Sequence, residues 1–171
     1  MIVYNRARVD LLEKKEMRNL NDGGHRDPLA ATMIIKATGQ KFYLLVNHLA
    51  RQKTSLRLKQ AGGLNDWARK QELPIIATGV YNFDWKVKEG ERKHDETFDV
   101  LTDADVFRWV RPEILIRTQN TPSNEVQDFV FVSGLPANWK ASSEIVIRPN
   151  DFPDNDETSD HRPVVAQIVI E

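Results

Sequence analysis

Short apolar runs, separated by polar turns, are the dominant pattern along this chain. Residues 30–37 and 41–47 are rich in β-branched and aromatic side chains, and Thr38-Gly39-Gln40 joins them. This arrangement is typical of a β-hairpin with a tight turn. Similar runs predict strands at residues 2–4, 9–12, 75–78, 114–117, 128–133, 144–148 and 164–170.

Helical periodicity is clearest in residues 54–71. Leu56, Leu64 and Trp67 fall on one helical face, and Thr54 is placed to cap the first turn. A shorter helix is expected at residues 103–110, and polar, turn-rich loops are expected at residues 19–28, 86–97 and 150–158. Many short strands with few helices predict a layered α+β protein rather than a regular βαβ fold.

The composition adds limits to this picture. The chain has 171 residues, 40% of them hydrophobic, which suits one domain over residues 1–171 with a sizeable core. There is no cysteine, so disulfides and cysteine-based metal sites are excluded, and a reducing cytoplasm is expected. No apolar run approaches the ~20 residues of a membrane span, and the first residues lack a signal-peptide pattern. We therefore expect a cytoplasmic protein without membrane contact.

The charge is unevenly distributed along the chain. Residues 1–70 hold 14 Lys or Arg and 6 Asp or Glu, whereas residues 71–171 hold 10 and 19. One interpretation is that the basic part meets phosphates and the acidic part holds a divalent cation. The other is that the two parts attract each other within one fold, since halves of a sequence need not form separate surfaces.

Polar side chains of catalytic type gather where predicted strands begin or end. A histidine held by a carboxylate can deprotonate a water molecule, and amides, imidazoles and a metal can stabilise charge on a phosphate. Residues of these types are Asn47-His48, Asn82, Asp128 and Asp160-His161. Each segment alone is a weak signal, but their order along the chain is informative.

The order of these motifs resembles the endonuclease/exonuclease/phosphatase superfamily, the deoxyribonuclease I-like proteins. The resemblance runs over residues 2–170, and the Ser-Asp-His-x-Pro ending is its most specific part. The matching segments are Asn47-His48-Leu49, Thr78-Gly79 with Tyr81-Asn82-Phe83, residues 128–133, and Ser159-Asp160-His161-Arg162-Pro163.

The resemblance implies catalytic roles for four positions. His161 resembles the general base or phosphate-binding histidine, and Asp128 resembles the carboxylate that orients it. His48 resembles the histidine that stabilises the pentacovalent phosphorus. Asn82 resembles the asparagine that holds the phosphate and the attacking water.

Three further positions are implied to bind ligands. Asp160 resembles the acidic residue near the Mg²⁺ or Mn²⁺ ion. Asn47 and Arg26 are implied to contact the substrate, and the match of Arg26 is loose. The partner implied by the family is a nucleic acid or another phosphodiester substrate.

Two departures from the family pattern weaken the expected metal site. The family has Gly-Asp-x-Asn where this chain has Val80, which can neither bind a cation nor accept a proton. In the family, the main metal-binding glutamate lies upstream of the segment that residues 2–12 of this chain resemble. Glu13 and Glu16 are the nearest carboxylates in the first part of the chain. We therefore expect weak binding of Mg²⁺ or Mn²⁺.

The resemblance implies a four-layered α/β sandwich that is incomplete at its N-terminal side. A missing strand leaves an unpaired sheet edge, so a homo-oligomer or an N-terminal partner chain is expected to cover it. The leading hypothesis is a divalent-metal phosphodiesterase or nuclease that is weak or inactive alone. The alternatives are a non-catalytic protein that binds nucleic acid or phosphate, and a fragment completed by an N-terminal partner.

Overall fold

The computed structural model describes residues 1–22, 24–120, 122–150 and 159–170. In chain order the elements are β1 (Val9–Glu16), η1 (Arg18–Leu20), β2 (Leu29–Ile35), β3 (Lys41–His48), α1 (Thr54–Ala68), β4 (Ile75–Lys86), α2 (Thr97–Thr102), η2 (Asp103–Asp105), β5 (Arg108–Trp109), β6 (Glu125–Ser133), β7 (Trp139–Ile145) and β8 (Val164–Ile170).

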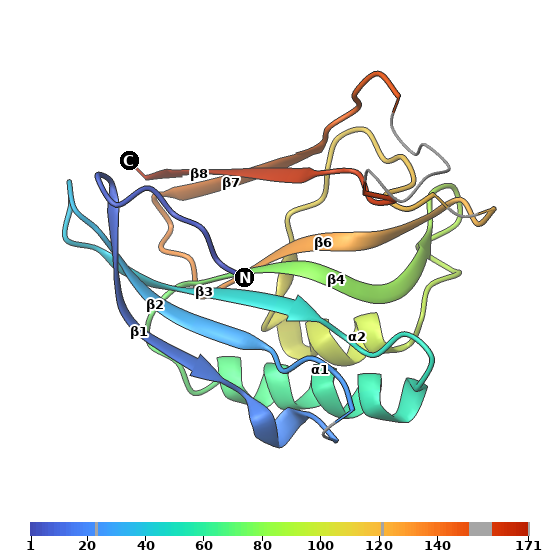
Figure 1. Cartoon of the computed structure of the whole chain (residues 1–171), viewed down its shortest axis with the longest axis horizontal. Coiled ribbons are helices and arrows are strands. Elements are labelled where there is room, and N and C mark those ends of the chain that lie inside the picture. The colour runs from blue at the N-terminus through green and yellow to red at the C-terminus, as the bar shows by residue number, and fades with distance from the viewer. Residues whose placement is uncertain (23, 121, 151–158, 171) are drawn as a thin grey trace.

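Three layers make up the molecule, as Figure 1 shows: a two-stranded sheet, a six-stranded sheet and a helical layer. The six-stranded sheet has the order β1-β2-β3-β4-β6-β5. Only β3 and β4 pair in parallel among these neighbours. A parallel pair needs a crossover, and α1 provides it. The chain therefore has the α+β class expected from its pattern of strands.

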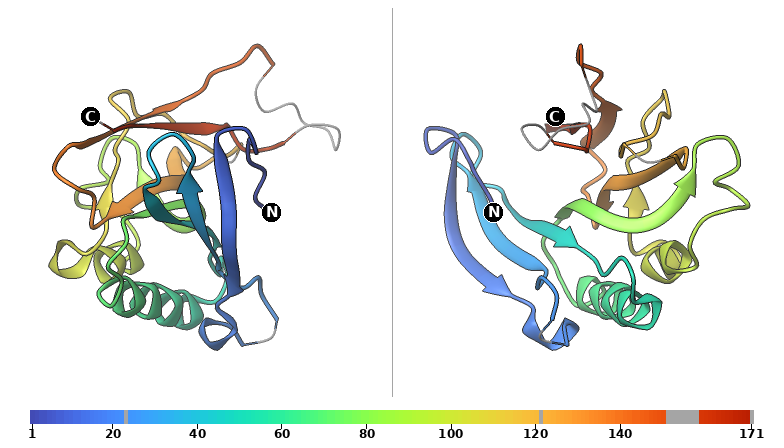
Figure 2. Two further views of the ribbon diagram at one scale, coloured as in Figure 1. Left: turned by 90° about the vertical axis from the view of Figure 1, so that its left-hand side faces the viewer. Right: turned by 45° about the vertical axis from the view of Figure 1, so that its right-hand side comes forward.

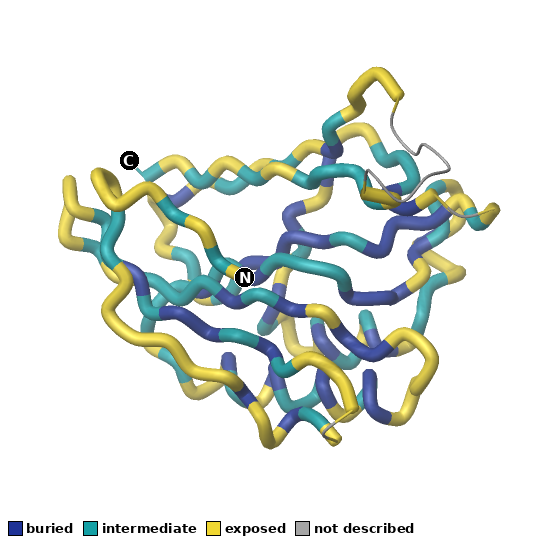
Figure 3. The backbone as a smooth tube through the Cα atoms, in the orientation of Figure 1, coloured by how far each residue is buried: buried dark blue, intermediate teal, exposed yellow. Residues whose placement is uncertain are grey.

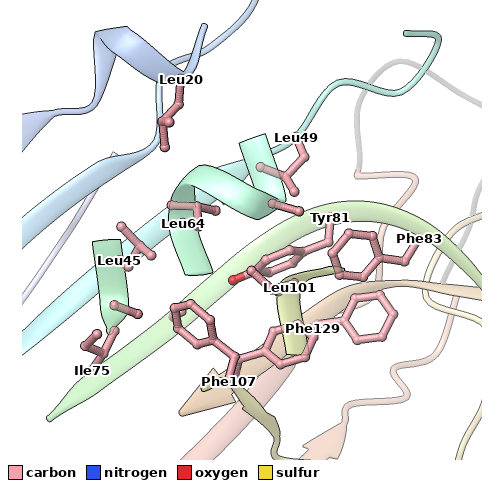
Figure 4. Packing of buried hydrophobic residues seen from close by; sticks show 14 of the residues in the cluster. Leu20, Leu45, Leu49, Leu64, Ile75, Tyr81, Phe83, Leu101, Phe107 and Phe129 are labelled. Atoms are coloured by element: carbon pink, nitrogen blue, oxygen red, sulfur yellow. The ribbon is translucent and has the colours of Figure 1, made fainter. Parts of the chain in front are cut away.

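An aromatic core lies between the six-stranded sheet and the helices. Tyr81 and Phe83 of β4 and Phe129 and Phe131 of β6 are at most 1% exposed. Tyr81, Phe83 and Phe129 lie near Leu64 of α1 and Leu101 of α2 in Figure 4. The rings of Phe129 and Phe131 stack with centroids 5.6 Å apart. Each buried side chain of this size stabilises the fold by about 1.5–3 kcal/mol.

The opposite face of the sheet is covered less completely. Val130 and Val132 of β6 pack with Ile168 of β8 and other residues of the two-stranded sheet. On β3, by contrast, the alternate residues Phe42, Leu44 and Val46 stay partly exposed. Figure 3 shows the same gradient, with β6 mostly buried, β4 buried or half-buried at all but one residue, and β1 largely exposed. Figure 2 shows how the twisted sheet carries β1 and β2 away from β6.

Several expected boundaries were wrong. Residues 2–4 and 114–117 are not strands; Pro112 precedes the second segment, and Ile114 is 74% exposed, with no sheet to bury it. The expected helix at residues 103–110 is broken because Ala104 and Asp105 have φ of 53° and 56°. The strand expected at residues 144–148 is β7, which ends at Ile145.

Two further expectations concern helix ends and loops. The cap of α1 is Lys53 rather than Thr54, and no side chain caps its amides. The loop expected at residues 86–97 contains turns and leads into α2, whereas residues 151–158 of the last expected loop lie outside the described residues. No helix in the described part of the chain is both long and apolar enough to cross a membrane.

Candidate functional site

A row of three side chains crosses the centre of the six-stranded sheet. His48 of β3 is paired with Val80 of β4, and Val80 is paired with Asp128 of β6. Directly paired residues project from the same face of a sheet. Val130 and Val132 share the face of Asp128 by alternation, and they pack towards the two-stranded sheet. The row therefore lies on the less covered face, away from the helices.

His161 joins this row from the segment before β8. Its Nδ1 is 2.8 Å from Oδ2 of Asp128, the contact expected from the sequence. The backbone around it is tied down by Asn120 N, which donates to Asp160 O at 2.8 Å, and by Arg162 N, which donates to Thr118 O at 2.8 Å. The hydrogen bond to Asp128 raises the pKa of His161 above its usual range. With Nδ1 engaged, Nε2 is the ring atom left to meet a ligand.

His48, at the other end of the row, has the opposite electrostatic environment. Burial lowers the pKa of His48, and the charges of Arg26 and His161 lower it further. The guanidinium of Arg26 contacts Nδ1 of His48. Two histidines whose pKa values are pushed apart can take different roles at one site, one charged and one neutral.

A bulge in β4 positions Asn82. The pairing with β6 shifts register between Val80 and Trp85, and Asn82 has a φ of 56°, which asparagine tolerates better than most residues. Its buried amide donates to the carbonyl of Leu49 at 2.8 Å. Asn82 thus fixes the backbone immediately after His48.

Asn47 is placed on the other side of the sheet. It is 3% exposed, and its Nδ2 donates to the hydroxyl of Tyr81 at 2.8 Å. Its side chain lies in the helix-side core, so the structure does not bring it together with His48. Strand β4 approaches Asn47 closely because Gly79, which pairs with Asn47, has no Cβ. A Cβ at Gly79 would lie 2.0 Å from the carbonyl oxygen of Asn47.

Two polar residues near the row, Asp84 and Gln127, were not identified from the sequence. Asp84 has a φ of 50° and accepts a hydrogen bond from Gln127 Nε2 at 2.9 Å. Burial raises the pKa of Asp84, and the charge of Glu125 raises it further. The alternation of Val80, Asn82 and Asp84 along β4 was the available signal. The bulge that aims these residues is not visible in the sequence.

The described residues do not form the divalent-metal site that the resemblance implies. In the described parts of the chain, no group of three or more His, Cys, Asp or Glu residues is placed to hold a metal ion. One carboxylate, Asp128, is occupied by His161. Asp160 is 65% exposed and accepts a bond from Gln119 at 3.3 Å. Between them and His48 stands Val80, which offers no oxygen.

The two N-terminal carboxylates named above do not fill this gap. Glu16 lines a cavity of about 500 Å³ together with Arg26 and His48, but its carboxylate pairs with Arg18 at 3.0 Å. Glu13 is exposed on β1. Since magnesium usually needs one or two carboxylates in near-octahedral geometry, these two side chains do not make a magnesium site.

Comparison with solved structures identifies the fold. An endonuclease/exonuclease/phosphatase family protein from Bacteroides thetaiotaomicron matches with a TM-score of 0.73 and 18% identity, over 98% of this chain and 68% of that chain. A mannosyl-6-phosphatase from the same organism matches with a TM-score of 0.69 and 18% identity, over 98% and 69%. TDP2 of D. rerio, complexed with a single strand DNA product, matches with a TM-score of 0.67 and 18% identity, over 95% and 69%.

No protein-family model and no curated protein sequence matches the chain. Identities of 18% to the solved structures carry the fold alone. The chain has the deoxyribonuclease I-like fold expected from its motifs, and it corresponds to about two thirds of each matching chain.

Proposed function

Because the chain has the fold of endonuclease/exonuclease/phosphatase proteins, we propose that it is a phosphodiesterase-type domain that binds a phosphoester at the row from His48 to His161 and cleaves it very slowly alone. The observation that carries this proposal is the 2.8 Å hydrogen bond between His161 and Asp128, at the end of that row. Asp128 orients the ring so that Nε2 can donate to a phosphate oxygen.

The two ends of the row act differently on a bound phosphate in this proposal. His161 donates from Nε2 at one end, and His48 with Arg26 offers an imidazole and a guanidinium at the other. Asn82 acts through the backbone, since its amide holds the Leu49 carbonyl. Asp160 lies 3.9 Å from His161 Nε2, and its charge raises the pKa of that ring further.

Slow turnover follows from what the row lacks. Val80 occupies the centre, where the family has an aspartate, and the described carboxylates do not cluster. Groups that act together in catalysis lose orders of magnitude in rate when one is missing, and the losses do not add. Phosphate binding, which rests on the row itself, is retained.

The test compares binding and cleavage in the same preparations. The unaltered chain, His161→Ala and the control His94→Gln are titrated with dimethyl phosphate, with the histidine ring protons followed by NMR. Cleavage of bis(4-nitrophenyl) phosphate is then measured with millimolar magnesium or manganese. His94 is a fair control because it also contacts a carboxylate, Asp99 at 3.0 Å, but lies against Trp85 on the helix side.

We expect His161→Ala to weaken phosphate binding roughly tenfold, the value of a charge-assisted hydrogen bond, and His94→Gln to leave it unchanged. Cleavage should stay near the rate of buffer with metal. Strong cleavage that disappears in His161→Ala would contradict the slow-turnover part. Phosphate binding that is equal in all three proteins would contradict the site.

A second candidate is completion by an N-terminal partner chain. Two observations favour it: about a third of each matching chain lies outside the part covered here, and Phe42, Leu44 and Val46 remain partly exposed beside the row. A partner segment that covers these side chains and brings a carboxylate next to Val80 would complete the site. Co-purification with such a segment, and a rise in cleavage on adding it, are the expected results.

A further inference from the structure

A second depression adjoins the row and has a marked positive character. It has a volume of about 360 Å³ and lies between the loop at Arg26 and the segment that follows His48, where Arg51 and Gln52 line it. We call it the Arg51 pocket. His48 belongs both to its wall and to the row, and Arg26, which contacts His48, lines the pocket as well. The pocket therefore adjoins the row.

The backbone of this pocket is fixed by a buried residue of α1. Arg57 is 3% exposed, and its guanidinium donates to the carbonyls of Ala50 and Arg51 at 2.6 and 2.7 Å. The same guanidinium pairs with Asp95 at 2.6 Å. The position of Arg51 is therefore set from inside the fold, while its side chain is exposed and makes no ion pair with any residue of the described ranges.

Among the described residues, no carboxylate forms an ion pair with Arg51, although its charge acts on Asp84. Asp22 is engaged by Lys53 at 2.5 Å and by His25 at 3.2 Å, and Asp27, next to Arg26, accepts a hydrogen bond from Asn21 at 2.7 Å. Helix α1 begins three residues after Arg51, with no acidic residue in its first turn and no side-chain cap. The uncapped amides at this helix end carry a partial positive charge, and they lie close to Arg51 in the sequence. The charge of Arg51 also acts on His161, which places it within electrostatic reach of the row.

We infer that the Arg51 pocket takes a second phosphate of the substrate, next to the one bound at His161. The inference rests on the proposed function and specifies its substrate class: compounds with two neighbouring phosphate groups. Successive phosphodiesters of one nucleic-acid strand and a small bisphosphate share this chemistry. Arg51 supplies the planar, two-pronged donor that suits a phosphate.

The experiment uses two pairs of probes with the full chain. One pair is a thymidine dinucleotide, with a single phosphate, and the trinucleotide, with two. The other pair is a hexose monophosphate and the corresponding bisphosphate. Dissociation constants are measured by NMR titration for the unaltered chain, Arg51→Gln, and the control Lys59→Gln, which removes an equal charge from an exposed site on α1. Thermal melts show whether each variant is folded.

We expect the second phosphate to improve binding about tenfold in the unaltered chain and in Lys59→Gln, and to improve it little in Arg51→Gln. Binding of the single-phosphate probes should be the same in Lys59→Gln, and it should fall less in Arg51→Gln than binding of the two-phosphate probes. A gain confined to the trinucleotide assigns the pocket to a nucleic-acid strand, and a gain confined to the bisphosphate assigns it to a small substrate.

Three results would overturn the inference. They are a second phosphate that adds nothing in the unaltered chain, equal losses in Arg51→Gln and Lys59→Gln, and no binding of any probe. The first two leave the proposed function standing if single-phosphate binding still depends on His161. If no probe binds and His161→Ala does not change phosphate binding, the proposed function is rejected as well.

Discussion

The two faces of the six-stranded sheet are built in different ways. The helix-side face is aromatic and closed: Tyr81, Phe83, Phe129 and Phe131 are almost fully buried. The opposite face carries His48, Val80 and Asp128 in one row and is covered by β7 and β8 only in part. The same strands therefore supply the stability of the fold on one face and the candidate chemistry on the other.

This difference explains why the polar row can exist at all. Alternating residues of β4 and β6 place large apolar rings towards the helices, so the other face need not be fully apolar to stabilise the fold. A polar side chain in the closed face must be satisfied within the protein, as Arg57 is by Asp95. On the open face, side chains such as His161 keep an atom available to a ligand.

The largest expected effect contrasts one aromatic residue on each face. Phe131→Ala removes a fully buried ring from the helix side and should lower the free energy of unfolding by about 3–5 kcal/mol. Phe42→Ala removes a partly exposed ring from the open face and should cost less than about 2 kcal/mol. Urea denaturation measures both. Equal losses would mean that the open face is packed as tightly as the closed one.

A second contrast concerns the ion pair that anchors the closed face. Asp95→Ala leaves the buried Arg57 without its carboxylate and should cost roughly 3 kcal/mol. The control Asp99→Ala removes an acidic residue whose side chain is 69% exposed and should cost no more than about 1 kcal/mol. Chemical denaturation measures the free energy of unfolding of both variants. A loss for Asp95→Ala as small as that for Asp99→Ala would show that water replaces Asp95 as the partner of Arg57.

The smallest effect is a pH dependence on the closed side. Burial lowers the pKa of His94, but the hydrogen bonds to Asp99 and the Gly90 carbonyl outweigh it and raise the pKa above 6.5. A raised pKa in the folded state means that the charged ring stabilises the fold below the unfolded pKa, and that this is lost as the pH rises through the folded pKa.

The measurement for His94 is the difference in unfolding free energy between the unaltered chain and His94→Gln as a function of pH. We expect a difference of at most about 1 kcal/mol, because Asp99 is mostly exposed. It should be largest in mildly acidic buffer and fall at alkaline pH. A difference that grows with pH would mean that burial, and not Asp99, controls the ring.

The sequence predicted those parts of the fold that alternate regularly. The hairpin of β2 and β3, helix α1 and strand β8 follow directly from period-2 or helical spacing, and the motif order indicated the deoxyribonuclease I-like fold. The contact between Asp128 and His161 was also expected, because both segments flank strands. The catalytic and binding roles of these residues stay predictions.

Other features depend on backbone geometry that spacing does not reveal. Strand β4 does not end at residue 78, as expected, but continues past Gly79 to Lys86. Gly79 instead permits the close approach of β4 to Asn47. The left-handed backbone of Asn82 and Asp84 creates the bulge that aims them. The Arg51 pocket was missed because it depends on a buried guanidinium, Arg57, which looks like an ordinary surface cation in the sequence.

The most direct test of the account is a titration with Mn²⁺ of the unaltered chain and of Val80→Asp, followed by paramagnetic broadening of the His48 and His161 ring signals. We expect no stoichiometric binding at low millimolar Mn²⁺ in the unaltered chain. Binding should be at least roughly tenfold tighter in Val80→Asp, since a carboxylate ligand then stands at the centre of the row. Tight one-to-one binding by the unaltered chain, unchanged in Val80→Asp, would contradict this expectation.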